Sequence, residues 1–270
     1  LAVFIGGSLL ARQVRLLWGV RTYKEALAAG PTKEGIDFVA LSGVAAAELT
    51  IKFGVMFALA FAMGWLRRRR TLVSYGITTA GHSVGRLFTA GVVLWALVFL
   101  PDLLLLLNRY LPLGEGAAHW WVLDQPWTPG FWLFMAASSF VLPPVFEELL
   151  IRGYIQTRLS EDYGPIGGIL LTAALFTVSH GQYHQLTILS LGMLASLFLG
   201  SAIWGYYFHR TGTLIPLIIA HALANVPLDG IAEHIQLLVM GIVITIAWKP
   251  VVRYVGEFVR ELSGGRPGRS

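Results

Sequence analysis

The chain has 270 residues, 56% hydrophobic and only 13% charged, against roughly 25% charged in a typical soluble domain, which excludes an ordinary water-soluble protein. The net charge of +5 does not indicate nucleic-acid binding, because the basic residues cluster beside apolar runs, as membrane topology requires. The sequence contains no cysteine, which excludes disulfides, thiol nucleophiles and cysteine metal sites. A spanning helix needs about 20 mostly apolar residues, so we predict an all-α, polytopic transmembrane bundle of about seven or eight spans.

The first 130 residues are predicted to be N-terminal transmembrane segments and their connecting loops. Leu1 to Val20 is apolar but interrupted by arginines, so we expect a short span that runs into an interfacial helix. The chain begins without methionine and without the charged n-region of a signal peptide, so we expect its recorded start to be trimmed or misassigned. A long span follows from Ile36 to Leu66 and ends in the basic block Arg67 to Arg70. The next span runs from Leu87 to Leu107.

The rest of the chain is predicted to hold several shorter spans. The connection Asn108 to Gly130 carries tryptophans typical of an aromatic belt at the membrane interface, namely Trp120, Trp121 and Trp127. The later spans are expected near 131–150, 164–179, 186–208, 214–226 and 235–248. Short helices that end in proline or glycine often pack around a polar cavity, because non-spanning backbone needs protein or water to satisfy it. Residues 131–228 would form the core around this cavity, 229–262 the last transmembrane helix and cytoplasmic end, and 263–270 a disordered tail.

Charge placement predicts the orientation of the bundle. If Arg67 to Arg70 are cytoplasmic, alternating spans put the later basic residues on the same side. These residues are Arg152, Arg158, His209, Arg210, Lys249, Arg253 and Arg260. The same count places the basic residues of the first segment outside, so either that segment does not span or something N-terminal is missing. We expect a multi-pass protein of a prokaryotic cell membrane. The sequence does not predict its oligomeric state.

Two adjacent carboxylates, Glu147 and Glu148, lie in an apolar run with Arg152 one turn after the second. Glu148 and Arg152 can pair along one helix face in the favourable order. Glu147 then projects about 100° away from its neighbour and is free to act as a general base. A buried ion network is an equally good interpretation of this motif alone. Each charged residue costs a few kcal/mol at the centre of a membrane helix, so three of them in six positions need a compensating role.

Two histidine motifs follow along the chain. His180 shares a helix face with Phe176, and His221 shares one with Asn225. A lone histidine at a helix end is more often structural, and the His221–Asn225 pair alone is more often an interhelical hydrogen-bond pair. His184 lies four residues after His180, a spacing that can bind zinc. The sequence lacks, however, the glutamate that a zinc protease helix places directly after its first histidine.

Taken together, the three motifs are interpreted as the lining of one water-filled pocket. Their polar members are Glu147, Glu148, Arg152, His180, His221 and Asn225. In a hydrolase of this design the first glutamate, with the first histidine, would activate a water molecule. The second histidine and the asparagine would stabilise the tetrahedral intermediate. The Glu-Arg pair would fix the position of the first carboxylate.

The ordered motifs Glu-Glu-x-x-x-Arg, Phe-x-x-x-His and His-x-x-x-Asn resemble those of the CPBP family, which comprises CAAX prenyl proteases and bacteriocin-processing or immunity proteins, also called Abi proteins. The resemblance covers about residues 131–228. It implies a glutamate-type intramembrane endopeptidase with no required metal or cofactor, acting on a membrane-associated protein or peptide. The charge placement puts the site nearer the cytoplasmic side. Carried over by position, Glu147 and His180 are the base and its partner, and His221 and Asn225 form the oxyanion site.

Two alternative functions remain open. The first is a zinc-dependent intramembrane protease, with His180, His184 or His221 and a glutamate as ligands. The second is a non-catalytic membrane immunity or scaffold protein of the same fold, or a small transporter that uses the same polar residues as a pathway. All of these interpretations share the lipid bilayer as a partner and none involves nucleic acid.

Overall fold

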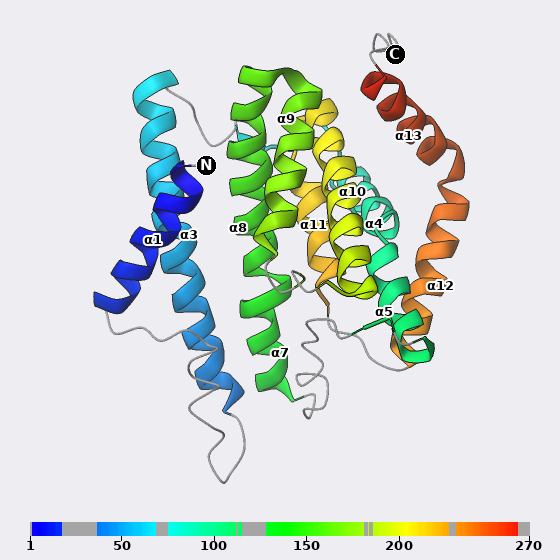
Figure 1. Ribbon diagram of the computed structural model, residues 1–270, viewed down its shortest axis with the longest axis horizontal. Helices are drawn as coiled ribbons and strands as arrows, with labels where there is room; N and C mark the ends of the chain where they lie inside the picture. Colours follow the sequence, from blue (N-terminus) through cyan, green and yellow to red (C-terminus); the bar gives the residue numbers. More distant parts are fainter. Residues whose placement is uncertain are drawn as a thin grey trace.

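The computed structural model describes residues 2–17, 37–68, 75–111, 113–114, 128–180, 183, 186–226 and 231–263. Every regular element in these ranges is a helix (Figure 1), which confirms the predicted all-α class. In chain order the elements are α1 (Ala2–Leu17), α3 (Phe38–Arg68), α4 (Val84–Ala96), α5 (Leu100–Tyr110), α7 (Pro129–Met135), the π-helix η2 (Ala136–Phe140), α8 (Leu142–Glu148), the π-helix η3 (Leu149–Gln156), α9 (Thr157–Ser179), α10 (Ile188–Thr211), α11 (Ile215–Ala224), α12 (Ile231–Ile246) and α13 (Trp248–Leu262).

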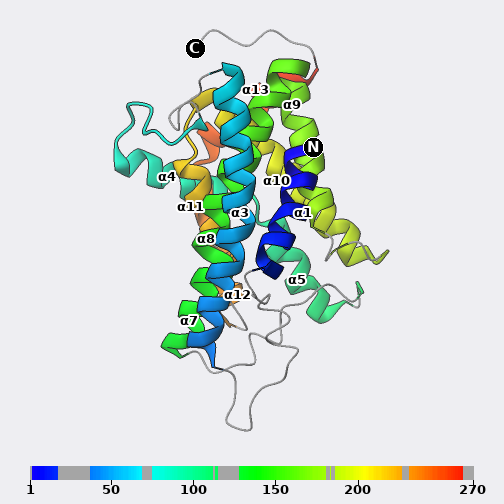
Figure 2. The same cartoon turned by 90° about the vertical axis from the view of Figure 1, so that its left-hand side faces the viewer.

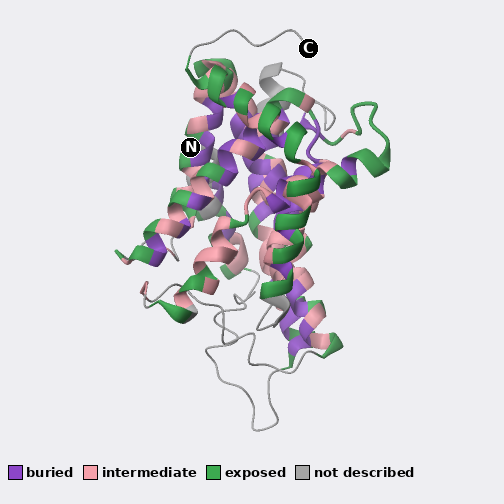
Figure 3. Cartoon of the chain, turned by 90° about the vertical axis from the view of Figure 1, so that its right-hand side faces the viewer, coloured by how far each residue is buried: buried purple, intermediate pink, exposed green. Residues whose placement is uncertain are grey.

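The outer faces of the helices carry large apolar side chains that no other part of the described chain covers. Leu199 on α10 is 54% exposed and Ile246 on α12 is 81% exposed. Buried residues lie where helices face one another, while exposed ones follow the outer surfaces (Figure 3). Exposed apolar surface on this scale is typical of a membrane-embedded or binding face. The protein is therefore an integral membrane protein whose outer surface faces lipid.

Within the described residues, four helical segments are long and apolar enough to cross a bilayer by length and composition: Phe38–Ala60, Val84–Asn108, Pro129–Ser179 and Ile188–Thr211. A bent pair, His234–Ile246 with Trp248–Leu262, raises the number to at most five. The predicted seven or eight spans are therefore not confirmed. Part of the difference lies in α1 and α11, which have 16 and 10 residues, short of the roughly 20 residues of a full span.

The segment Pro129–Ser179 accounts for another part of the difference, because it contains two of the predicted spans. Gly164 has φ 76° and ψ 165°, a conformation outside the helical region, and Pro165 follows it. Glycine adopts positive φ without steric cost, so the chain can reverse at this point. Figure 1 shows the two arms, one through α7 and α8 and the other through α9, lying side by side.

Helices α8 and α11 contact each other, and they also contact α3 and α4, respectively. Contacts join α1 to α3, α3 to α7, α9 to α10, α4 to α11, and α12 to both α4 and α5. The pairing of α1 with α3 at one side of the bundle is visible in two views (Figures 1 and 2). One buried cluster gathers Phe53, Leu150 and Phe176, and another gathers Trp204 and Leu217. The polar motifs lie between these two clusters.

Several predictions concern segments outside the described residues. They are the tryptophan belt of the 108–130 connection, the last two arginines of the basic block, the sequence after Ser263 and the basic residues that follow α1. The orientation of the bundle stays a prediction.

Candidate active site

The two glutamates lie on α8 between two π-helical stretches. Pro143 and Pro144 occupy the first turn of α8, where a missing backbone N–H costs little. The preceding turn closes with a hydrogen bond from Val141 N to Ala136 O at 3.0 Å, five residues apart. Turns of this kind are rare and frequently occur at functional sites. The irregular backbone before and after α8 sets the direction in which Glu147 and Glu148 project.

Glu148 and Arg152 form a fully buried ion pair. Arg152 Nη1 donates to Glu148 Oε1 at 3.0 Å, and both side chains are 0% exposed. Arg152 Nη2 also donates to Ser201 Oγ on α10 at 2.9 Å. The predicted pairing along one helix face is confirmed. Because a buried charge without a partner costs several kcal/mol, this pair fixes both side chains.

His221 joins the same carboxylate from α11. Its Nδ1 lies 2.8 Å from Glu148 Oε1. A carboxylate paired with arginine is ionised and only accepts hydrogen bonds, so Nδ1 carries the proton and donates. The other ring nitrogen, Nε2, then faces Glu147 Oε2 at 3.9 Å. The two ring nitrogens of His221 thus contact the two glutamates, which places the first and third motifs side by side.

Two aromatic rings enclose the ion pair. The Arg152 guanidinium lies 4.6 Å from the centroid of Phe176 and 5.8 Å from that of Trp204, within the range of a cation–π contact. The Trp204 ring also lies 5.7 Å from that of His221. Its Nε1 donates to Leu94 O at 3.2 Å, which holds the ring against α4. The rings exclude water from the buried side of the site.

His180 ends the second arm of the hairpin, immediately after α9. Its ring lies edge-on to Phe176 with the centroids 4.5 Å apart, and its Nδ1 lies 2.7 Å from Phe176 O. A carbonyl oxygen only accepts, so Nδ1 carries the proton and Nε2 is left as the free nitrogen. Phe176 also faces His221 at 6.3 Å between centroids. His180 therefore joins the site through the Phe176 ring that both histidines share.

Asn225 ties the end of α11 to the π-helix before α8. Its Nδ2 donates to Ser139 O at 3.1 Å, and Ser139 Oγ donates to Asn225 O at 3.0 Å. An asparagine amide has two N–H donors, so one remains after this bond. The reciprocal pair holds α11 against the segment that carries the glutamates.

The structure thus brings the predicted residues together in three ways. Direct contacts join Glu147, Glu148, Arg152 and His221, while His180 is joined through Phe176 and Asn225 through Ser139. Sequence reasoning missed Ser139, Ser201 and Trp204. In sequence, a serine or tryptophan within an apolar helix looks like any packing residue, and no spacing signal distinguishes these three.

The zinc alternative concerns residues that the structure describes only in part. Within the described ranges, no group of three or more histidine, aspartate and glutamate side chains is placed to hold a metal ion. His184 lies outside the described residues.

The segment that carries the site is similar to a known protein family. Residues 129–227 match the model of the family described as type II CAAX prenyl endopeptidase Rce1-like. This segment is therefore similar to the Rce1-like family. It begins with α7 and ends just after Asn225, so the Rce1-like segment contains all six polar residues of the site. The CAAX protease resemblance seen in the sequence is confirmed, and the Rce1-like family is a family of proteases. Neither the curated proteins nor the solved structures that were compared gave a match.

Proposed function

We propose that the protein is an intramembrane endopeptidase that hydrolyses a peptide bond of a membrane-associated protein or peptide. The observation that carries the proposal is the contrast between two adjacent glutamates. Glu148 is fully buried and held by Arg152 and His221, whereas the Glu147 side chain is 29% exposed and faces His221 Nε2. One carboxylate is thus fixed in the protein, and its neighbour is open to a substrate and to water.

Glu147 is the general base in this mechanism. Among the described residues no hydrogen bond to its carboxylate is found, so its oxygens are available to a water molecule. His180, with its Nε2 free, orients the same water. The water oxygen attacks the peptide carbonyl carbon while Glu147 takes its proton. The proton then passes to the departing amine as the C–N bond breaks.

His221 and Asn225 stabilise the oxyanion of the tetrahedral intermediate. The second N–H of the Asn225 amide is one donor. His221 is the other donor in its doubly protonated form, whose second proton comes from solvent water before the substrate binds, and the carboxylate of Glu148 beside Nδ1 stabilises that form. Preorganised donors of this kind contribute about 10² to 10³ in rate each.

The reaction is proposed to need no metal. Support for this comes from the described residues, in which no group of three or more histidine, aspartate and glutamate side chains is placed to hold a metal ion, and from the Glu148 Oε1 atom, which is shared by Arg152 and His221. A carboxylate neutralised by a buried arginine is a weak ligand for a dication.

The test is cleavage of membrane-anchored peptides by the purified protein in lipid nanodiscs, with and without EDTA. The panel contains a prenylated peptide ending in a CAAX sequence, the same peptide without the prenyl group, and an unrelated single-span peptide. We expect cleavage of at least one peptide at an unchanged rate in EDTA. Loss of cleavage that added zinc restores would establish the metalloprotease instead. No cleavage of any panel member by a folded preparation would favour the immunity or scaffold function.

A further inference from the structure

A second hollow lies away from the six residues of the site. It has a volume of about 1000 Å³ and is bounded by α4, α10, α13 and the residue before α13. None of the six site residues lines it. Leu94 lines this hollow and also accepts the hydrogen bond of Trp204, so α4 and that tryptophan separate it from His221.

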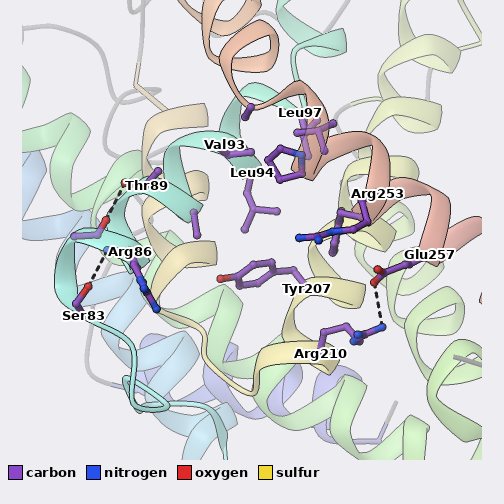
Figure 4. A pocket seen from close by; sticks show the side chains of 16 residues that line it. Ser83, Arg86, Thr89, Val93, Leu94, Leu97, Tyr207, Arg210, Arg253 and Glu257 are labelled. Carbon is purple, nitrogen blue, oxygen red and sulfur yellow. Dashed lines mark hydrogen bonds and ion pairs between the residues drawn. The ribbon is translucent and has the colours of Figure 1, made fainter. Parts of the chain in front are cut away.

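The walls of this cavity differ in chemistry from one end to the other. One wall is apolar and is formed by Val93 and Leu94 of α4, Leu97 just after α4, and Val251 of α13. The other part of the cavity wall is polar. It is formed by the side chains of Arg86, Arg253 and Tyr207 (Figure 4). Figure 4 shows Arg253 extending into the cavity toward the Tyr207 ring. The cavity is therefore amphipathic.

The charges of the arginines are not equally balanced. Arg210, which also lines the cavity, lies 3.2 Å from Glu261 and 3.4 Å from Glu257. For Arg86 and Arg253, no carboxylate partner is found among the described residues. Glu257 also lines the cavity, but it is paired with Arg210. The guanidinium groups of Arg86 and Arg253, which lie beside an apolar wall, therefore favour an anion that is attached to an apolar chain.

The helix that closes the cavity has the character of an interfacial helix. α13 is bent by 81° from the helix before it. Its Val251 and Phe258 are buried, while Lys249, Arg253 and Arg260 are exposed. A helix with one apolar and one charged face lies in the plane of the membrane surface. The cavity beneath it is then at the depth of the lipid headgroups.

We propose that this cavity binds one anionic phospholipid. The phosphate and its acidic headgroup lie between Arg86 and Arg253, and an acyl chain lies along the α4 wall of Val93 and Leu97. Charge complementarity favours an acidic lipid, because the ammonium of a zwitterionic headgroup would face two unpaired arginines. The bound lipid joins α13 to α4 and α10.

The test measures retention of phosphatidylglycerol and phosphatidylcholine by the full chain, using native mass spectrometry after extraction from mixed vesicles. Wild type should retain phosphatidylglycerol preferentially, and Arg86→Gln with Arg253→Gln should weaken this retention at least about tenfold, because each basic contact to an acidic lipid is worth about a factor of five. Both arginines are exposed, so we expect the double variant to fold. A matched control replaces Arg12 and Arg260, two exposed arginines outside the cavity, and should retain the lipid as wild type does.

A second variant, Ala90→Phe, fills the cavity without changing charge and should also reduce retention. Equal retention by wild type and the Arg86/Arg253 variant would overturn the proposal. An equal loss in the Arg12/Arg260 control would also overturn it, because general surface charge would then explain the binding. If the cavity instead held the carboxylate of a substrate, the Arg86/Arg253 variant would raise KM for a peptide in pure phosphatidylcholine nanodiscs, where the lipid proposal expects no change.

Discussion

At the scale of single residues, the site rests on one carboxylate oxygen with two partners. Glu148 Oε1 accepts from Arg152 at 3.0 Å and from His221 at 2.8 Å. The Arg152 guanidinium balances the charge of the buried carboxylate, which would have no counter-charge without Arg152, and the His221 contact orients the imidazole ring. The local fold and the orientation of His221 therefore depend on the same interaction.

Replacing Arg152 by methionine should lower the free energy of unfolding by about 3 to 5 kcal/mol, because the fully buried Glu148 would lose its counter-charge. Adding Glu148→Leu should recover most of that loss and leave activity low, since His221 would lack the acceptor that orients it. Arg158→Met is the control, because Arg158 pairs with Glu161 near the surface and should change stability by no more than about 1 kcal/mol. Reversible unfolding in mixed micelles measures all three. A double variant as unstable as the single would contradict the buried-charge argument.

Variants of Asn225 and Ser139 test whether Asn225 acts as an oxyanion donor or only tethers α11 to the π-helix before α8. Asn225→Ala should lower kcat by about 10² to 10³, as removal of an oxyanion donor does. Ser139→Ala removes the hydroxyl that donates to Asn225 O but keeps the carbonyl that accepts from Asn225 Nδ2. It should cost less than about tenfold, a change well below that of losing a donor. Equal losses of kcat in single-turnover assays would assign Asn225 to tethering alone.

At the scale of elements, the sequence was most informative where helical spacing acts within one helix. The pairing of Glu148 with Arg152 and the shared face of Phe176 and His180 follow from i, i+4 spacing. Contacts between helices could not be read in this way, because the partners Ser139 and Ser201 lie 86 and 49 residues away from the groups they bind. Element lengths were also uncertain, since apolar composition does not reveal a reversal such as that at Gly164.

The position of α11, which carries His221, depends on a close approach to α4. A Cβ added to Gly91 would lie 2.7 Å from Ile219 Cγ2 and 3.0 Å from Pro216 O. Gly91→Ala should therefore push α11 away, cost about 1 to 3 kcal/mol through overpacking and lower kcat. Gly85→Ala on the same helix meets nothing within 4 Å, so it should be neutral or stabilising. Thermal unfolding and kcat are measured for both, and identical behaviour of the two variants would contradict the close approach.

At the scale of the whole molecule, composition predicted the membrane environment but not the number of spans. An apolar exterior is what 56% hydrophobic and 13% charged residues predict, whereas the polar interior was predicted from the three motifs and the aromatic rings around it were not predicted. The short α11 and the hairpin reduce the number of full spans while bringing three motifs into one place. In the proposed function, the irregular helices form the reaction site and the long regular ones hold it in the bilayer.

The central claim is that Glu147 activates the water that attacks the substrate. The direct measurement is the single-turnover cleavage rate of a peptide that wild type cleaves, compared for Glu147→Gln and Glu161→Gln. Glu161 is a glutamate in the partly exposed pair with Arg158 and serves as the matched control. With all proteins equally folded in nanodiscs, Glu147→Gln should be slower by at least about 10² and Glu161→Gln unchanged. Cleavage by Glu147→Gln at the wild-type rate would contradict the account.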